Sequence, residues 1–491
     1  MRINRREFLG FALATAAAKS FAAAYGKPEL KLGVMSDIHV SLDPKSPKFE
    51  NVKFFRKALE YFRDHGVDGV VIAGDLADRG RIDELELVAK TWFEVFPDDK
   101  APDGRYVERL FTYGNHDLDP WGWHVRYSRK NNKEPDSAAY RPIFISHPDN
   151  IGPVWERVFG EPFARVKTKT VKGFTFVLSN WRGPTSADRA YAKVYGTKEF
   201  VAEHGAELPK DRIFFHVQHQ HPSGTIFENW GWGHDGGELK KAYGKRPNLV
   251  CFSGHSHTSL TDERGVWQGE FTSVNAASIS AMGRDYSGID NAEKSGFDQD
   301  PVRKAHENSM LAIDRGPARQ VLLCDVWSDH LVLKRRDVAF DEDVGPDWFL
   351  PMPSTDEWGF AKRKARRVAP AFAAGAKAVA TKVDRCALAA KKFKDTPGVE
   401  VTFPVAETRE GCRVFDYAVR PFAKTADGEK PLGARFVLST QWAQPLARID
   451  YSAKEMCYFP ATDFPADTPV VFRIAPRDCF GLEGKSIEVT L

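Results

Sequence analysis

Aspartate, asparagine and histidine residues concentrate in five short segments between residues 37 and 257. The five segments are Asp37-Ile38-His39, Gly74-Asp75-Leu76-Ala77-Asp78, Gly114-Asn115-His116-Asp117, His219-Gln220-His221-Pro222 and Gly254-His255-Ser256-His257. Each segment follows directly on a run that we expect to form a strand. Because ligands bind beyond the carboxyl ends of the strands in an open sheet, the five segments would meet at one site if these strands are neighbours.

The candidate ligand set from these segments consists of carboxylates, imidazoles and one amide oxygen, without a thiolate. This set suits Zn²⁺, Mn²⁺, Fe or Co, whereas Ca²⁺ prefers oxygen ligands throughout. Asp37 and His39 are two residues apart, as are His255 and His257, so in an extended chain both side chains of a pair would leave on the same side. The Asp75 carboxylate could offer one oxygen to each of two metal ions. Such a pair of ions would stabilise both the attacking and the leaving oxygen of an in-line displacement.

In this order the five segments resemble the motifs of the calcineurin-like metallophosphoesterase superfamily, over roughly residues 30–335. The resemblance implies two divalent metal ions and hydrolysis of phosphomonoesters or phosphodiesters by attack of a metal-bound hydroxide. It also implies that Asp75 bridges the two ions. The remaining ligands would be Asp37, His39 and His257 for the first ion, and Asn115, His219 and His255 for the second.

The resemblance gives two further residues a role in catalysis. His116 would protonate the leaving alkoxide or neutralise charge in the transition state, and a histidine with a pKa near neutrality suits that task. Asp117 would orient His116, as a carboxylate fixes an imidazole tautomer. Purple acid phosphatases carry a coloured Fe(III)–tyrosine pair, with the tyrosine three residues after the bridging aspartate. Here that position is Asp78, so we expect a colourless enzyme with a divalent pair.

The fourth segment offers a choice of ligand. We expect a strand over residues 213–218, which places His219 at its tip, and His221 is the second choice. His216 lies in the middle of this strand and is expected to be a structural histidine.

Two segments rich in tryptophan and glycine flank the motifs and are expected to be loops over residues 119–124 and 230–236. Loops on strand tips commonly decide specificity. Their side chains could stack on a base or a sugar ring, or could cover the site and exclude water. The candidate substrate-binding residues are Trp121, Trp123, Trp232 and His234.

The elements that must position these segments alternate between strands and helices, which predicts an α/β domain with layers ordered α/β/β/α over residues 28–345. Helices are expected at 51–65 and 82–96, where apolar residues recur at helical spacing. The expected strands are 30–36, 67–73, 109–113, 174–179, 213–218, 249–253 and 321–326. The strand at 67–73 has no polar face, which indicates a sheet covered on both sides.

Beyond this domain we expect a linker over residues 346–370 and a β-sandwich of fibronectin III or immunoglobulin type over residues 371–491, because short alternating runs recur at regular spacing. Residues 361–394 contain eleven lysines and arginines against a single acid, Asp384. This stretch is interpreted as a solvated linker. The alternative is contact with an anionic surface, either lipid headgroups or the acidic face of the first domain.

The chain has 491 residues, 28% of them charged, and a formal net charge of +3. Four basic residues and one acid lie within the first 24 positions, so the remainder is formally neutral and we expect no nucleic-acid binding. Residues 1–24 have a basic start, an apolar middle and Ala22-Ala23-Ala24 as a cleavage site. With Arg5-Arg6, they resemble a twin-arginine export signal, which implies the twin-arginine machinery as partner and a periplasmic or secreted protein. An ordinary secretory signal or an amphipathic first helix are the alternatives.

Taken together, the sequence predicts an exported hydrolase that acts on small phosphate esters. Extra cations in the pocket would favour monoesters, and because no motif supplies them the prediction leans slightly towards diesters or a broad specificity. Two alternatives stay open: a metal-binding pseudoenzyme, and a surface-docking protein in which the C-terminal sandwich makes the contact.

Overall fold

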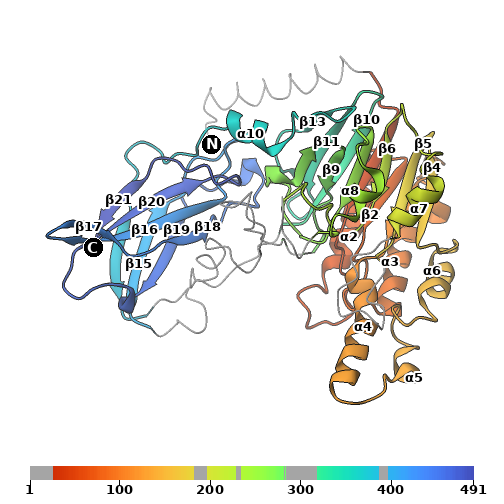
Figure 1. Ribbon diagram of the computed structural model, residues 1–491, viewed down its shortest axis with the longest axis horizontal. Helices are drawn as coiled ribbons and strands as arrows, with labels where there is room; N and C mark the ends of the chain where they lie inside the picture. The colour runs from red at the N-terminus through yellow and green to blue at the C-terminus, as the bar shows by residue number, and fades with distance from the viewer. Residues whose placement is uncertain (1–25, 182–195, 228–233, 281, 283–317, 386–395) are drawn as a thin grey trace.

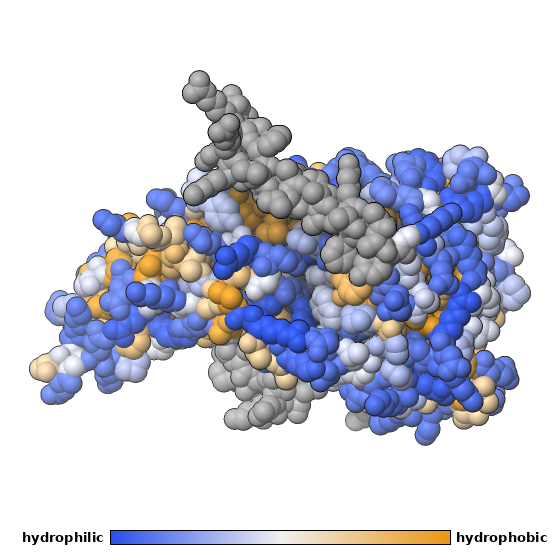
Figure 2. All heavy atoms as spheres, turned by 90° about the horizontal axis from the view of Figure 1, so that it is seen from above, coloured by the Kyte–Doolittle hydropathy of each residue, from blue (hydrophilic) through white to orange (hydrophobic). Residues whose placement is uncertain are grey.

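A computed structural model describes residues 26–181, 196–227, 234–280, 282, 318–385 and 396–491. Two units follow one another along the chain, one with two mixed sheets and flanking helices and one built of antiparallel strands (Figure 1). Hydrophilic residues cover most of the face shown in Figure 2. Within the described residues, no helix has both the length and the apolar character that crossing a membrane requires.

The first sheet of the first unit has the strand order β12-β11-β10-β1-β2-β3, and β13 pairs with β11. Strands β1, β2 and β3 are parallel, while β10 is antiparallel to β1. The bounds are β1 Leu30–Met35, β2 Gly69–Ala73, β3 Glu108–Thr112, β10 Gln320–Val326, β11 His330–Asp337, β12 Glu342–Asp343 and β13 Trp348–Pro351. Strand β13 lies inside the predicted linker, so the first unit extends beyond residue 345.

The second sheet has the order β4-β5-β6-β7-β9-β8. Strands β5, β6, β7 and β9 are parallel, and the two outer pairs, β4 with β5 and β8 with β9, are antiparallel. The bounds are β4 Val166–Val171, β5 Phe174–Ser179, β6 Phe214–Val217, β7 Leu249–Ser253, β8 Val266–Gln268 and β9 Thr272–Asn275. Because parallel strands have their carboxyl ends at the same edge of a sheet, the residues that follow these strands lie close together at that edge.

Three apolar clusters hold the layers together. One cluster joins the two sheets, with Val34 and Val71 from the first and Phe215 and Val250 from the second. A second cluster packs helices on the outer face of the first sheet, and a third packs helices on the outer face of the second. The layers therefore run helix, sheet, sheet, helix, and the predicted α/β class is confirmed.

The helices of this unit are α2 Asn51–Asp64, α3 Ile82–Val95, α4 Asn115–Lys130, α5 Ser137–Tyr140, α6 Ile151–Phe159, α7 Thr197–His204 and α8 Glu238–Tyr243, with 3₁₀ turns η1 Pro97–Asp99 and η2 Glu263–Gly265. Helix α2 buries Phe55, Leu59 and Phe62, which are spaced to share one face. A Cβ on Gly33 of β1 would overlap the Phe62 ring, so this glycine allows α2 to lie directly on the sheet.

The second unit contains two antiparallel sheets with the orders β14-β15-β19 and β17-β16-β20-β21, and β18 pairs with β16. One apolar core contains Val401 and Phe459 from the smaller sheet and Tyr417 and Phe472 from the larger one. The strands are β14 Val379–Val383, β15 Gly398–Pro404, β16 Asp416–Thr425, β17 Gly428–Pro431, β18 Arg435–Leu438, β19 Lys454–Pro460, β20 Val470–Arg477 and β21 Ile487–Thr490, with 3₁₀ turns η4 Leu446–Arg448 and η5 Ala461–Asp463. The fibronectin III or immunoglobulin assignment stays a prediction.

The two units are joined by buried ion pairs around Glu263 of η2. Helix α10, Phe360–Arg366, supplies Arg363, whose Nη1 donates to the Glu263 and Val266 carbonyl oxygens. Arg367 Nη1 lies 2.7 Å from Glu263 Oε2, and its Nε donates to Asp478 of the second unit. Burial opposes ionisation of Glu263, but Arg367 and Arg363 outweigh it and hold the pKa of the carboxyl below its usual range. Part of the basic stretch therefore contacts an acid of the first unit.

We expect Glu263→Ala to destabilise the chain by about 3–5 kcal/mol, because it removes the buried carboxylate that Arg363 and Arg367 share. The measurement is the free energy of unfolding from urea titration. The matched control is Glu357→Ala, which removes exposed pairs of the same helix with Lys362 and Arg366 and should change little. Equal effects of the two substitutions would contradict the assignment of Glu263 as the centre of the interface.

Candidate metal centre

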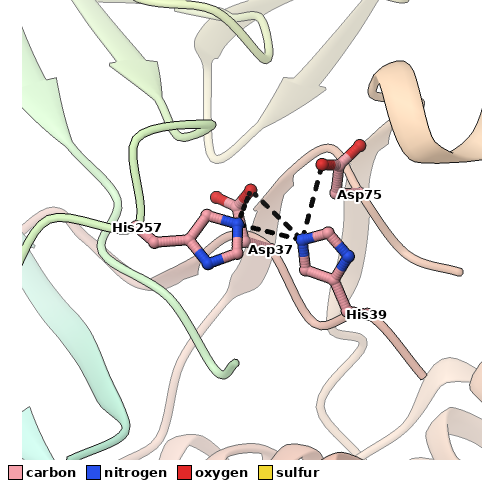
Figure 3. Close-up of side chains that lie close together, drawn as sticks. All are labelled: Asp37, His39, Asp75 and His257. Atoms are coloured by element: carbon pink, nitrogen blue, oxygen red, sulfur yellow. Dashed lines mark hydrogen bonds and ion pairs between the residues drawn. The ribbon is translucent and has the colours of Figure 1, made fainter. Parts of the chain in front are cut away.

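The five polar segments follow the carboxyl ends of β1, β2, β3, β6 and β7, and the structure brings their side chains together. The first group consists of Asp37, His39, Asp75 and His257 (Figure 3). His257 Nε2 lies 3.0 Å from His39 Nε2 and 3.1 Å from Asp37 Oδ1. His39 Nε2 lies 3.7 Å from Asp37 Oδ1 and 3.5 Å from Asp75 Oδ2.

The second group surrounds His219, whose Nε2 lies 3.1 Å from Asp75 Oδ2 and 3.0 Å from Asn115 Oδ1. His255 Nδ1 is 3.1 Å from the same nitrogen. Asp75 belongs to both groups, because its Oδ2 faces His39 in the first and His219 in the second. One buried carboxylate thus connects two sets of donor atoms.

The chemistry of these donors fits divalent cations. His219 Nδ1 lies 2.8 Å from the Ala73 carbonyl oxygen, which can only accept, so Nδ1 carries the hydrogen and Nε2 presents its lone pair. That lone pair faces two further acceptors, the oxygens of Asp75 and Asn115. Without a cation this arrangement favours a proton instead: burial opposes protonation, but Asp75 and Asp37 outweigh it and raise the pKa of His219 to about 9.

The backbone of these residues differs from the expected extended chain. Five residues have left-handed backbone angles, with φ of 51° at Asp37, 48° at His39, 54° at Asp75, 73° at His255 and 55° at His257. The extended-chain argument for the two residue pairs is therefore wrong. A left-handed conformation costs a non-glycine residue about 1–3 kcal/mol, and such residues cluster at functional sites. Here it turns side chains from successive strand ends towards a common centre.

Three glycines that precede the motifs make room for side chains from other strands. A Cβ on Gly114 would overlap Asp75 Oδ1, and a Cβ on Gly254 would lie 2.5 Å from Asp37 Oδ2. A Cβ on Gly74, where φ is +90°, would lie 2.5 Å from His219 Nδ1. These glycines are part of the site because any side chain would displace a candidate ligand.

His116 lies beside the first group. Its ring packs edge-on against His39 at 4.4 Å between centroids, and its Nδ1 lies 2.7 Å from the Asp78 carbonyl oxygen. Burial lowers the pKa of His116 to about 4, although Asp75 opposes this shift. The imidazole is therefore neutral near pH 7 in this site without metal or substrate.

The predicted role of Asp117 in orienting His116 is wrong. Its Oδ1 accepts from the backbone N–H of Ala77 at 2.9 Å, and its Oδ2 accepts from the N–H groups of Gly114 at 2.8 Å and Leu76 at 3.3 Å. Adjacent residues of a helix do not face each other, so Asp117 points away from the His116 ring. It caps α4 and ties the helix to the segment after β2.

Residues 30–259 match the family model described as calcineurin-like phosphoesterase. The match supports a calcineurin-like phosphoesterase domain in this chain. It covers β1 to β7 and all seven residues of the two groups.

Solved structures show weaker likenesses. A dimetal phosphatase from Danio rerio has 10% sequence identity and a TM-score of 0.35, with 66% of this chain and 99% of that chain covered. A purple acid phosphatase from yellow lupin (Lupinus luteus) seeds has 14% identity and a TM-score of 0.39, with 67% and 55% covered. No curated protein matches the chain.

Lys48 is a residue of the site that sequence reasoning missed. Its Nζ lies 2.5 Å from Asp78 Oδ1 and 3.2 Å from His39 Nδ1. Asp78 Oδ1 is also 3.4 Å from His39 Nδ1. Burial opposes ionisation of Asp78, but His39 and Lys48 lower its pKa well below the usual range. His39 Nδ1 therefore lies between a carboxylate and an ammonium group, and its Nε2 faces the first group. A lone lysine in a turn carries no sequence signal.

The fourth segment places His219 in the second group and keeps the other histidines out of it. His221 pairs with hydroxyls at both nitrogens, Ser253 Oγ at 2.9 Å and Ser256 Oγ at 2.8 Å. His216 Nδ1 lies 3.2 Å from the Tyr243 hydroxyl within the core. His221 and His216 therefore have structural partners that account for them.

The candidate substrate-binding residues have different surroundings. The predicted loop at 119–124 is part of helix α4, because the Asp117 cap starts a helix in which Pro120 lies near the beginning. Trp121 packs against His147 and Tyr140, at 5.0 and 5.7 Å between centroids, away from the site. Trp123 lies 6.3 Å from the His116 ring.

The second aromatic segment lies partly outside the described residues, and Trp232 is among those not described. His234 is buried, and its Nε2 lies 3.1 Å from the Ile226 carbonyl oxygen. This contact indicates a structural position for His234, so Trp123 is the described candidate whose ring lies beside His116.

We expect Gly114→Ala to lower the metal content, because the new methyl group would push Asp75 out of both groups. At φ −109° and ψ −166° alanine fits the backbone angles of residue 114, but its Cβ would also lie 2.5 Å from the Asp75 backbone nitrogen, so the segment after β2 must shift as well. Elemental analysis after dialysis measures the metal, and circular dichroism checks the fold. The control is Gly152→Ala, where a Cβ would meet Phe163 atoms only at 3.9 Å. Two metal ions per chain in Gly114→Ala would contradict this geometry.

Proposed function

We propose that this chain is an exported hydrolase of small phosphate esters that works with two divalent metal ions. The observation that carries the proposal is the position of Asp75, whose Oδ2 faces His39 at 3.5 Å and His219 at 3.1 Å. Mn, Zn, Fe or Co suit the imidazole and carboxylate donors. When bound, such ions activate water as a nucleophile and neutralise the charge on a transferring phosphoryl group.

The chain's own residues divide the remaining tasks. The Ala73 carbonyl oxygen holds His219 in one tautomer, and Asp78 and Lys48 position the His39 ring at its Nδ1. His116 is held by the Asp78 carbonyl oxygen at Nδ1, which leaves its Nε2 to deliver a proton to the leaving oxygen. That role needs a second proton on the ring, and the negative charge of a bound phosphate ester would favour it.

The preference for diesters or a broad specificity stays a proposal, and Lys48 does not change it. A free cation beside the phosphate would favour the more highly charged monoester. Lys48 is instead paired with Asp78 at 2.5 Å and contacts the Nδ1 side of His39, opposite the nitrogen that faces the group. Its charge is therefore already compensated.

We expect His116→Ala to retain metal and to lose activity by about a hundredfold to ten-thousandfold, because it removes the proton donor. The measurement is kcat/KM on monoester and diester substrates, with enzyme loaded with Mn²⁺, Zn²⁺ or Fe²⁺. The loss should be larger for alkyl esters than for nitrophenyl esters, whose leaving group needs no proton. His204→Ala, an exposed histidine in α7, is the control. Equal losses for both classes of ester would contradict the proton-donor role.

Export by the twin-arginine pathway is proposed from residues 1–24, which lie outside the described residues. We expect Arg5→Lys with Arg6→Lys to block export, because that pathway reads the arginine pair as an address. Fractionation of cells that produce the full chain measures the periplasmic share. Unchanged export of the double variant would assign the segment to the general secretory route.

A further inference from the structure

One face of helix α4 leads away from the candidate centre and carries aromatic side chains. His116, Trp123 and Tyr127 are spaced by seven and four residues, so they lie within about 20° of one line along the helix. Trp123 is 43% exposed and Tyr127 is 69% exposed. Trp121 of the same helix points into the packed cluster with Tyr140 and His147 instead.

The aromatic face begins at the residue that would release the leaving group. The Trp123 ring lies 6.3 Å from the His116 ring at an interplanar angle of 86°. A group that departs from the His116 side of the phosphorus meets Trp123 first, and Tyr127 lies about 6 Å further along the helix axis. The exposed indole therefore borders the place where a leaving alcohol would lie.

The aromatic side chains limit the chemistry of the ligand. Aromatic rings bind flat rings by stacking and also bind organic cations. Helix α4 carries the acids Asp117 and Asp119 as well as Arg126, Arg129 and Lys130, so its charges do not decide between these two classes. We favour the flat ring, and the test includes choline esters.

We propose that Trp123, with Tyr127 beyond it, binds a flat aromatic ring on the leaving group of the ester. The proposal rests on the proposed function and adds the class of leaving group to it. Stacking of a ring on an aromatic side chain is typically lost on substitution by alanine, with about a fivefold to hundredfold fall in affinity. Trp123 is thus a specificity residue that touches the substrate and leaves the phosphoryl chemistry to the metal centre.

The test compares benzyl phosphate with ethyl phosphate, or dibenzyl with diethyl phosphate, on the full chain loaded with Mn²⁺. The alcohols in each pair differ in the ring and little in acidity, so the ratio of their kcat/KM values reports ring binding. We expect the native chain to prefer the benzyl ester and Trp123→Ala to lower the ratio about fivefold to hundredfold. Trp123→Phe should restore most of it.

The matched control is Tyr106→Ala, because Tyr106 is 50% exposed and precedes β3, at the end of the sheet opposite the centre. A second readout is direct binding, by calorimetry, of 2-phenylethylphosphonate and of propylphosphonate, which cannot be hydrolysed. The native chain should bind the phenyl compound more tightly, and Trp123→Ala should remove the difference.

The failure of this inference is distinct from failure of the proposed function. Equal kcat/KM for benzyl and ethyl esters in the native chain, or an unchanged ratio in Trp123→Ala, overturns the leaving-group site while hydrolysis stands. A preference for choline esters over benzyl esters also overturns it. If neither ester is hydrolysed, the proposed function fails, and the phosphonate binding difference then decides whether Trp123 binds a ring.

Discussion

The structure depends on the convergence of lone pairs around Asp75. One buried carboxylate oxygen faces His39 on one side and His219 on the other, and the nitrogens of both rings face further acceptors. Such an arrangement repels itself unless positive charge enters it. This arrangement has a conformational cost, because five of the candidate ligands have a left-handed backbone and glycines must leave room for them. Bound cations would offset that cost.

The second unit is fastened to the segment that follows the last ligands. Only five residues separate His257 from Glu263, which pairs with Arg363 and Arg367. The Leu260 carbonyl oxygen accepts from Arg335 at 2.9 Å, so this segment is held at several points. Two arginines of the basic stretch, Arg363 and Arg367, are thus buried and compensated by Glu263.

Most of the framework was readable from the sequence because buried parallel strands have a strong signature. Strands β5 and β7 occupy the predicted residues 174–179 and 249–253. Helices α2 and α3 end within one residue of their predicted ends. The helical nature of residues 119–124 was missed because a proline and two tryptophans on either side of a glycine suggest a loop. The contacts of Asp117 with Ala77 and of Trp121 with His147, which hold this helix in place, join residues far apart along the chain. Strand β13 was assigned to a linker for the same reason, since its partner β11 lies outside the local pattern.

The amino-acid sequence by itself determined which donor atoms are present and which strand ends carry them, because residue type and hydrophobic period are local properties. Tertiary structure decided between the first choice His219 and the second choice His221, and it decided that the Asp117 carboxylate binds the Ala77 N–H and that Lys48 compensates Asp78. These outcomes depend on which hydroxyl, carbonyl or carboxylate lies within hydrogen-bonding distance after the sheets have packed. Such distances join residues far apart along the chain, and no local pattern contains them.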